Sequence, residues 1–303
     1  MLLPVLFLSF LSFASATPRP LVLWHGLGDS ATSKGMLEFA QEIRGVHPGI
    51  FIHSVYLDED LDKDRRAGFY GNVNEQVEAA AEQISAIPEL ADGFNALGFS
   101  QGGQFLRAYV ERFNSPPVHN LITFGSQHTG VSDVGVCGPR DLLCQIARRA
   151  TKAGVYSPWA QENLVQAQYF RDPANLAAYY AANHFLTSIN NELVDSRNTT
   201  YARNLASLNT LVLIKFTEER TVVPAESSWF GSEIVEDDVA YGSQHVLESG
   251  RTMLSMREQP LYQEDWIGLR ELDERGGIEF LECKGQHMQI GDCWEDIVRQ
   301  YAS

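Results

Sequence analysis

The 303-residue chain has little positive charge, few cysteines and no long apolar run beyond its first residues. Its 39 acidic residues outnumber its 23 lysines and arginines, which gives a formal charge of −16. Because binding to phosphates needs a basic face, this charge argues against a nucleic-acid partner. No stretch reaches the roughly 18 apolar residues of a transmembrane helix, so no stable membrane span is expected. The composition is otherwise that of a globular domain.

Motifs for metal and nucleotide binding are also missing from the sequence. There is no His-Glu-x-x-His pair, no cluster of Cys and His and no calcium-binding loop. Residues 26–28 read Gly-Leu-Gly, but the third glycine of a dinucleotide loop and the Gly-Lys-Ser/Thr of a phosphate loop are absent. We therefore expect neither a metal nor a cofactor.

The first 16 residues are typical of a secretory signal peptide. Leu2 to Phe13 is almost wholly apolar, and Ala14-Ser15-Ala16 is a small-x-small cleavage pattern. A retained anchor is the alternative, although the stretch is short for a membrane span. We expect the mature chain, residues 17–303, to enter the secretory pathway and to reach a lysosome, a vacuole or the exterior.

Four cysteines on an oxidising route predict disulfides, with three connectivities open. Proximity in the sequence favours Cys137 with Cys144 and Cys283 with Cys293, and buried free thiols are the alternative. Asn198 begins an acceptable N-glycosylation sequon, which predicts an exposed loop.

Strand-like and helix-like patterns alternate along most of the chain. The strands are expected at 20–24, 50–57, 94–99, 118–124, 210–216 and 277–283, and the helices at 35–46, 73–87, 102–113 and 292–301. This alternation predicts right-handed βαβ crossovers and a mainly parallel sheet covered on both faces, so the expected fold class is α/β in a single domain.

An insertion at about 127–205 interrupts this alternation, with helical patterns at 158–169 and 175–191. It is rich in aromatic residues: Tyr156, Trp159, Tyr169, Phe170, Tyr179, Tyr180 and Phe185. Two interpretations remain open, namely that these side chains line an apolar groove or that they form the small core of a covering subdomain.

The motif Gly-x-Ser-x-Gly at residues 98–102 marks Ser100 as a candidate nucleophile. The motif is short enough to arise by chance, but here it follows an expected strand and opens an expected helix. That setting is the nucleophile elbow of the α/β-hydrolase fold, in which flanking glycines allow a sharp turn that exposes the serine hydroxyl.

A serine nucleophile needs a base, and in this fold the chain order is Ser, then Asp or Glu, then His. His287 is the best placed of the candidates His128, His245 and His287, because it lies between the last strand and the last helix. Glu218 and Glu219 directly follow the strand at 210–216, and either is a candidate acid.

The oxyanion hole of this fold uses two backbone N–H groups. One belongs to the residue after the nucleophile, here Gln101. The other comes from a loop after an early strand, for which Leu27 is our candidate.

With these residues identified, the chain resembles the palmitoyl-protein thioesterase family over nearly the whole mature sequence. The matching segments are LVLWHGLGDS, GFSQGGQFLRAYVERF, PPVHNLITFGSQHTGV, the loop from Cys137 to Cys144, NLVQAQYFRDP, SSWFG and QEDWIGLRELDERG. The resemblance implies an α/β-hydrolase with Ser100 as nucleophile, His287 as base, and Leu27 and Gln101 at the oxyanion positions. It also implies that the helical insertion binds an acyl chain.

The chain departs from the family pattern at the acid. The family has an aspartate three residues after the strand's Phe, before Val-x-Pro, and here Glu219 occupies that position between Phe216 and Val222. Glu219 is therefore preferred over Glu218, and glutamate is an accepted triad acid in this fold.

The implied activity is hydrolysis of fatty-acyl thioesters, palmitoyl above all, from cysteines of S-acylated proteins or peptides by a chain acting as a monomer. Two alternatives remain: a lipase or ester hydrolase with the same triad, and a catalytically silent lipid-binding protein that keeps the fold.

Overall fold

The computed structural model describes residues 17–133, 154–233, 245–246 and 252–303. The expected signal peptide and the loop from Cys137 to Cys144 lie outside the described residues.

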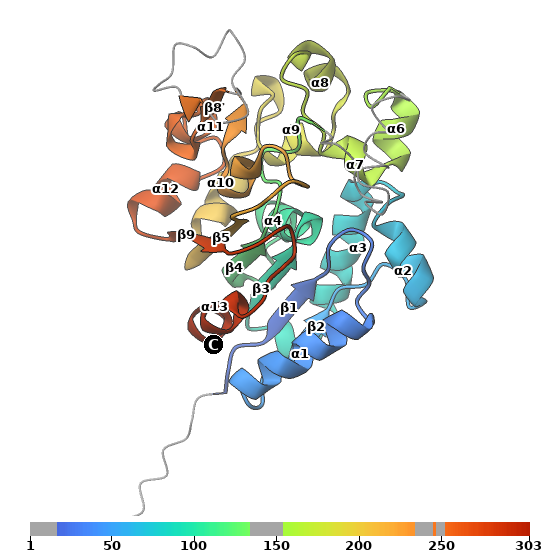
Figure 1. The fold of residues 1–303 in the computed structure, drawn as a ribbon, viewed down its shortest axis with the longest axis vertical. Coiled ribbons are helices and arrows are strands. Elements are labelled where there is room, and N and C mark those ends of the chain that lie inside the picture. The colour runs from blue at the N-terminus through green and yellow to red at the C-terminus, as the bar shows by residue number, and fades with distance from the viewer. Residues whose placement is uncertain (1–16, 134–153, 234–244, 247–251) are drawn as a thin grey trace, which may run out of the picture.

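A six-stranded parallel sheet with the order β2-β1-β3-β4-β5-β9 forms the centre of the molecule (Figure 1). Its strands are β1 (Leu21–Trp24), β2 (Ile52–Ser54), β3 (Phe94–Phe99), β4 (Val118–Phe124), β5 (Thr210–Phe216) and β9 (Ile278–Cys283). Every residue of β1 and β3 is buried, as expected for strands covered on both faces. The predicted α/β class is confirmed.

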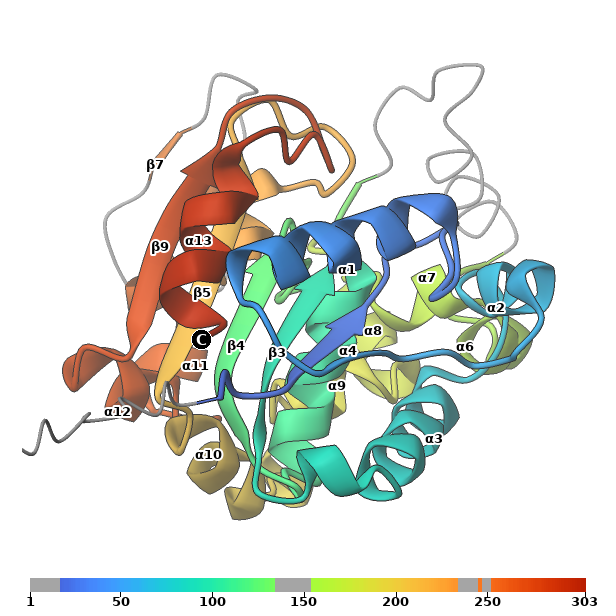
Figure 2. The same ribbon diagram turned by 90° about the horizontal axis from the view of Figure 1, so that it is seen from below.

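Helices cover both faces of this sheet (Figures 1 and 2). On one face are α1 (Lys34–Val46) and α13 (Cys293–Tyr301). On the other are α3 (Val73–Ser85), α4 (Gln101–Arg112), α10 (Thr199–Ala206) and α12 (Leu269–Glu274). Alternate residues of a strand enter different layers: Leu21 and Leu23 pack toward α1, whereas Val22 packs toward α4.

Shorter elements complete the described structure. The helices are α2 (Leu61–Ala67), α6 (Pro158–Asn163), α7 (Val165–Gln168), α8 (Leu176–Ala182), α9 (Leu186–Ile189) and α11 (Pro260–Gln263). Single 3₁₀ turns lie at Pro88–Leu90, Val194–Ser196, Ala225–Trp229 and Met256–Glu258. A small antiparallel sheet has the order β6-β8-β7, from Ser232–Glu233, Thr252–Leu254 and His245–Val246.

The two helices expected in the insertion are each broken in two. The break between α6 and α7 falls at Leu164, which is extended and forms a β-bridge with Tyr70. The break between α8 and α9 includes Asn183, whose side chain bonds the Gln168 carbonyl and the Thr187 amide. A β-bridge at the first break and side-chain hydrogen bonds of Asn183 at the second therefore override a continuous helical pattern.

Most of the insertion's aromatic side chains are core residues. Tyr169, Phe170, Tyr179 and Phe185 are buried in the same apolar cluster as α3 and α4. Phe185 packs edge-on against Phe105 of α4, with ring centroids 5.6 Å apart. Trp159 and Tyr180 are exposed. These four residues thus extend the main core instead of forming a separate small core, and none of them lines the cavity at Ser100.

The carboxyl ends of β3, β5 and β9 lie at one edge of the sheet because all three strands are parallel. Ser100 follows β3, Glu219 follows β5 and His287 follows β9. The topology thus brings together residues that are far apart in the chain. Across the described ranges, no helix combines the length and apolarity needed to cross a membrane.

Candidate active site

Ser100 occupies the turn between β3 and α4 in a strained backbone conformation, with φ 51° and ψ −121°. A positive φ is uncommon for a residue with a side chain, and here it turns the chain sharply from strand into helix. The Ser100 amide donates to the carbonyl oxygen of Phe124 at 2.8 Å, which fixes the turn against β4. The hydroxyl lies just before the amino end of α4, where unpaired N–H groups favour negative charge.

Close backbone approaches explain why glycines flank this serine. A Cβ atom at Gly98 would lie 2.4 Å from the Cα of Gly103, and one at Gly102 would lie 2.4 Å from the carbonyl oxygen of Trp24. The chain thus comes within contact distance of itself on both sides of Ser100. This geometry is that of the nucleophile elbow expected from the motif.

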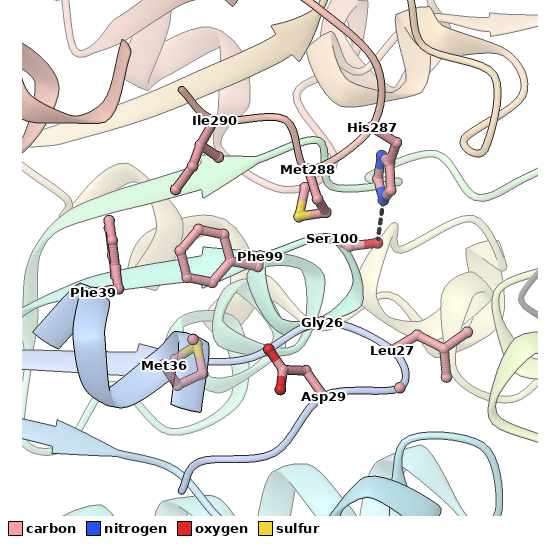
Figure 3. Close-up of a pocket in the computed structure, with 12 residues that line it drawn as sticks. Gly26, Leu27, Asp29, Met36, Phe39, Phe99, Ser100, His287, Met288 and Ile290 are labelled. Carbon is pink, nitrogen blue, oxygen red and sulfur yellow. Dashed lines mark hydrogen bonds between the residues drawn. The ribbon is translucent and has the colours of Figure 1, made fainter. Parts of the chain in front are cut away.

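His287 is within hydrogen-bond reach of the serine. Its Nε2 atom lies 3.1 Å from Oγ of Ser100, as the dashed line in Figure 3 marks. The imidazole side chain is 11% exposed, so substrate can approach it. The arrangement allows His287 to take the hydroxyl proton from Ser100 when the oxygen attacks a carbonyl carbon.

Glu219 holds the other nitrogen of the same ring. Its Oε2 atom lies 2.5 Å from Nδ1 of His287, and its side chain is fully buried. Oε1 accepts hydrogen bonds from the amides of Thr221 at 2.7 Å and Val222 at 3.0 Å. Both carboxylate oxygens are therefore engaged, and the glutamate is long enough to reach the imidazole.

Glu218 is exposed, unlike its neighbour. Its amide donates to the carbonyl oxygen of Gly285 at 2.9 Å, while the Gly285 amide donates to Oγ1 of Thr217 at 3.1 Å. These bonds join the loop after β5 to the loop after β9. They bring Glu219 beside His287 and leave the Glu218 side chain toward solvent.

The other candidate bases are placed differently. His128 is fully buried, its Nε2 lies 3.1 Å from Oγ1 of Thr123, and its ring stacks on Phe230 with centroids 4.5 Å apart. Burial lowers the pKa of His128 well below its usual value, and the nearby Arg107 charge lowers it further. His245 belongs to β7, and its side chain lies outside the described part.

The loop that carries Leu27 lies against the serine turn. A Cβ atom at Gly26 would lie 3.3 Å from the carbonyl oxygen of Phe99 and 3.4 Å from Cβ of Ser100. Gly26, Leu27 and Ser100 line the same cavity. This places the Leu27 backbone and the first residue of α4, Gln101, on the two elements that an oxyanion hole requires.

Asp64 of α2 anchors this loop, a role that the sequence analysis missed. Its carboxylate accepts from the amides of Ala31 and Leu57, each at 2.8 Å, and lies 3.4 Å from Nε2 of His25. Burial opposes its ionisation, but bonds from His25, Leu57 and Ala31 outweigh burial and lower the pKa of Asp64. In the sequence, the only indication of a polar anchor for this loop was His25, which directly follows β1.

A cavity of about 480 Å³ opens at Ser100 and His287 (Figure 3). Its apolar wall consists of Met36, Phe39, Phe99, Met288 and Ile290. Met36 and Phe39 come from α1, and Met288 and Ile290 come from the loop after His287. Their apolar spacing in the sequence is also that of ordinary core residues, which is why no pattern singled them out.

Three of the remaining predicted residues, Cys283, Cys293 and Asn198, are described and lie outside the reacting groups. Cys283 and Cys293 form a disulfide that closes the loop containing His287. Cys137 and Cys144 lie outside the described residues. Asn198 is exposed and caps α10, where its side-chain oxygen accepts from the Thr200 amide at 2.9 Å.

Comparison with known proteins agrees with this geometry. A family model described as palmitoyl protein thioesterase matches residues 20–287. Palmitoyl-protein thioesterase 1 of Caenorhabditis elegans is 41% identical, with 99% of this chain and 98% of that protein covered. Palmitoyl-protein thioesterase 3 of Dictyostelium discoideum is 33% identical, with 89% and 85% covered. The human lysosomal thioesterase PPT2 is 28% identical, with 91% and 84% covered.

The family match includes Ser100, Glu219 and His287, the three residues that the fold brings together. It also includes the loop of Leu27 and the whole of α4. The chain belongs to the palmitoyl protein thioesterase family.

Proposed function

We propose that this protein is a serine thioesterase that removes long-chain acyl groups, palmitoyl above all, from cysteines of proteins or peptides. The hydrogen-bonded series from Ser100 through His287 to Glu219, in a chain of this family, is the observation that carries the proposal. Membership of the family supports the substrate class. The hydrogen-bonded series supports the reaction chemistry.

Acylation begins when Oγ of Ser100 attacks the thioester carbonyl carbon and its proton passes to Nε2 of His287. Glu219 fixes the orientation of the ring and stabilises the imidazolium that forms. The amides of Leu27 and Gln101 are the proposed donors to the negative oxygen. The carbon–sulfur bond then breaks, the leaving thiolate takes the proton from His287 and departs as a thiol, and the acyl group stays on Ser100.

Deacylation repeats the same steps with water. His287 removes a proton from water, which attacks the acyl-serine, and Ser100 recovers its proton as the fatty acid leaves. A thiol has a pKa of about 8.5, so it leaves with less help from a general acid than an alcohol needs. His287 therefore needs to act only as a weak general acid when the substrate is a thioester.

A direct comparison of two substrates tests this proposal. A palmitoylated cysteine peptide and the matching palmitoylated serine peptide differ only in sulfur or oxygen at the scissile bond. We expect a higher kcat/KM for the thioester. A preference for the oxygen ester would instead identify an ester hydrolase with the same triad.

Labelling with a fluorophosphonate separates an enzyme from a silent lipid-binding protein. We expect the wild-type protein to be labelled and Ser100→Ala to be unlabelled, because the probe reacts only with an activated serine. An unlabelled wild-type protein would remove the enzymatic assignment.

The place of action belongs to the same proposal. A relative named as a lysosomal thioesterase and the sequence of residues 1–16 support entry into the secretory pathway and delivery to a lysosome or vacuole. Glycosylation at the exposed Asn198 is consistent with that route. We further propose that residues 17–303 form a single domain that includes the insertion. We also propose that the protein acts as a monomer and that acyl thioesters are its ligands.

A further inference from the structure

The apolar wall of the cavity beside Ser100 lies on one side of the serine. Figure 3 shows Met36, Phe39, Phe99 and Ile290 together on that side, while Leu27 lies on the other. The cavity is lined by α1, by the end of β3, by the loop of His287 and by residues 26–29 of the loop of Leu27. None of the described insertion residues, 127–133 and 154–205, lines it.

The insertion instead approaches the opposite side of the nucleophile, at Gln101. The hydroxyl of Tyr169 donates to Oε1 of Gln101 at 3.3 Å, and Nε2 of Gln101 donates to the carbonyl oxygen of Gly68 at 3.1 Å. Gln166 of α7 donates to the same carbonyl at 3.1 Å. The two substituents of a carbonyl carbon at Ser100 therefore face two different surroundings.

The proton transfer decides which substituent faces the cavity. The leaving sulfur must come within hydrogen-bond reach of Nε2 of His287, because that nitrogen returns the proton to it. His287, Met288 and Ile290 belong to the cavity wall, so the leaving group departs along this wall. The acyl chain is a separate substituent of the same carbon, so it extends away from this wall, toward the insertion.

We propose that this cavity binds the leaving-group side of the substrate, specifically a large apolar side chain beside the acylated cysteine of a peptide or protein. The assignment rests on the proposed thioesterase function. Its physical basis is the apolar wall of Met36, Phe39 and Ile290, which stabilises a bound side chain in proportion to the apolar area removed from water. A substrate with alanine at that position leaves the wall hydrated.

Gly35 allows the cavity to be filled without disturbing its walls. It lines the cavity one turn before Phe39 on α1, and a Cβ atom added there meets nothing within 4 Å. Gly45 is the matched control, because it lies on the same helix with the same open surroundings but does not line the cavity. Leucine at either position improves helix propensity, so Gly35→Leu and Gly45→Leu should both fold.

The experiment measures kcat/KM for two palmitoyl-cysteine peptides that differ only by phenylalanine or alanine next to the cysteine. We expect the wild-type protein and Gly45→Leu to favour the phenylalanine peptide by about tenfold, since the cavity buries the ring. Gly35→Leu should reduce that ratio to within about twofold, because its side chain occupies the same space. A ratio is used since it does not depend on the amount of active enzyme.

Three results would overturn the assignment. The first is equal kcat/KM for the two peptides in the wild-type protein, and the second is an unchanged ratio of the two kcat/KM values in Gly35→Leu. The third is a loss of kcat/KM in Gly35→Leu that differs between decanoyl and palmitoyl peptides. The last result would place the acyl chain in the cavity. If the wild-type protein does not cleave the palmitoyl thioester of N-acetylcysteamine, the proposed function fails as well; cleavage without a peptide preference removes the cavity assignment alone.

Discussion

Glu219 and His287 are joined by a hydrogen bond of 2.5 Å between Oε2 and Nδ1, although 68 residues separate them in the chain. The loops after β5 and β9 hold the pair in place, because the Glu218 amide donates to the Gly285 carbonyl oxygen and the Gly285 amide donates to Oγ1 of Thr217. Because Oε1 is occupied by the amides of Thr221 and Val222, the carboxylate has one orientation in which it faces the imidazole.

Replacing this carboxylate should impair turnover far more than replacing its neighbour. We expect Glu219→Gln to lower kcat by at least about 100-fold, because a neutral amide neither stabilises the imidazolium nor fixes the ring tautomer. Glu218→Gln, the matched control, should stay within about twofold of the wild-type kcat because its side chain is exposed. Steady-state kinetics with a palmitoyl thioester measure both, and equal losses would refute the assignment of Glu219.

Asp64 should act on catalysis by positioning the loop of Leu27. Asn has one acceptor oxygen in place of two, so Asp64→Asn leaves the amide of Ala31 or Leu57 without its partner. We expect kcat to fall by about tenfold with KM nearly unchanged, since a displaced oxyanion donor is felt mainly in the transition state. Asp62→Asn on the exposed side of α2 is the control. A raised KM with normal kcat would point to substrate binding instead.

Local sequence patterns were sufficient to predict the elements that carry the site. The apolar runs of β3, β4 and β5 begin and end where they were predicted, because buried parallel strands are continuous apolar segments. The strand–turn–helix around Ser100 follows from its glycines, and chain order then favours His287. The structure brings these two residues within 3.1 Å.

Features that depend on distant contacts were not predictable in the same way. The break at Leu164 follows from its bridge with Tyr70, which lies on another part of the chain. Glu218 and Glu219 are indistinguishable by composition, and only the family resemblance favoured Glu219. Met36 and Phe39 lie on the apolar stripe of α1, where cavity-lining and core residues give the same pattern.

The Cys283–Cys293 disulfide should stabilise the loop that holds His287. The bridge closes a short loop with a sequence separation of 10, so its loss in C283A/C293A should cost about 2–3 kcal/mol of unfolding free energy. We also expect a lower kcat, because a looser loop keeps His287 less often within reach of Ser100. Denaturant unfolding and kinetics measure the two effects, and a non-reducing peptide map checks the bridge in the wild-type protein. A variant as stable and active as the wild-type protein would contradict this role.

A buried charge cluster links α4 to the insertion. Arg107 donates to Oε1 of Glu111 at 2.9 Å, to the Ile189 and His128 carbonyl oxygens and to Oδ1 of Asn190, and both charged side chains are fully buried. Burial raises the pKa of Glu111 to about 7, against the opposing effect of the Arg107 charge. The folded protein therefore holds the Glu111 proton at pH values where the unfolded chain releases it.

This cluster predicts a stability difference that depends on pH. The raised pKa of Glu111 contributes to the unfolding free energy. This contribution is fully present below the unfolded pKa of 4.5 and is lost as the pH rises toward 7. Glu111→Gln stays uncharged throughout, so we expect its unfolding free energy, relative to the wild-type protein, to rise by up to about 3 kcal/mol between those pH values. The lowered pKa of His128 acts in the opposite direction but is common to both proteins and cancels in the difference. Urea unfolding between these two pH values measures the difference in unfolding free energy between Glu111→Gln and the wild-type protein. Glu78→Gln, at an exposed position of α3, is the control. Parallel stability curves for Glu111→Gln and the wild-type protein would show that Glu111 stays ionised in the folded state.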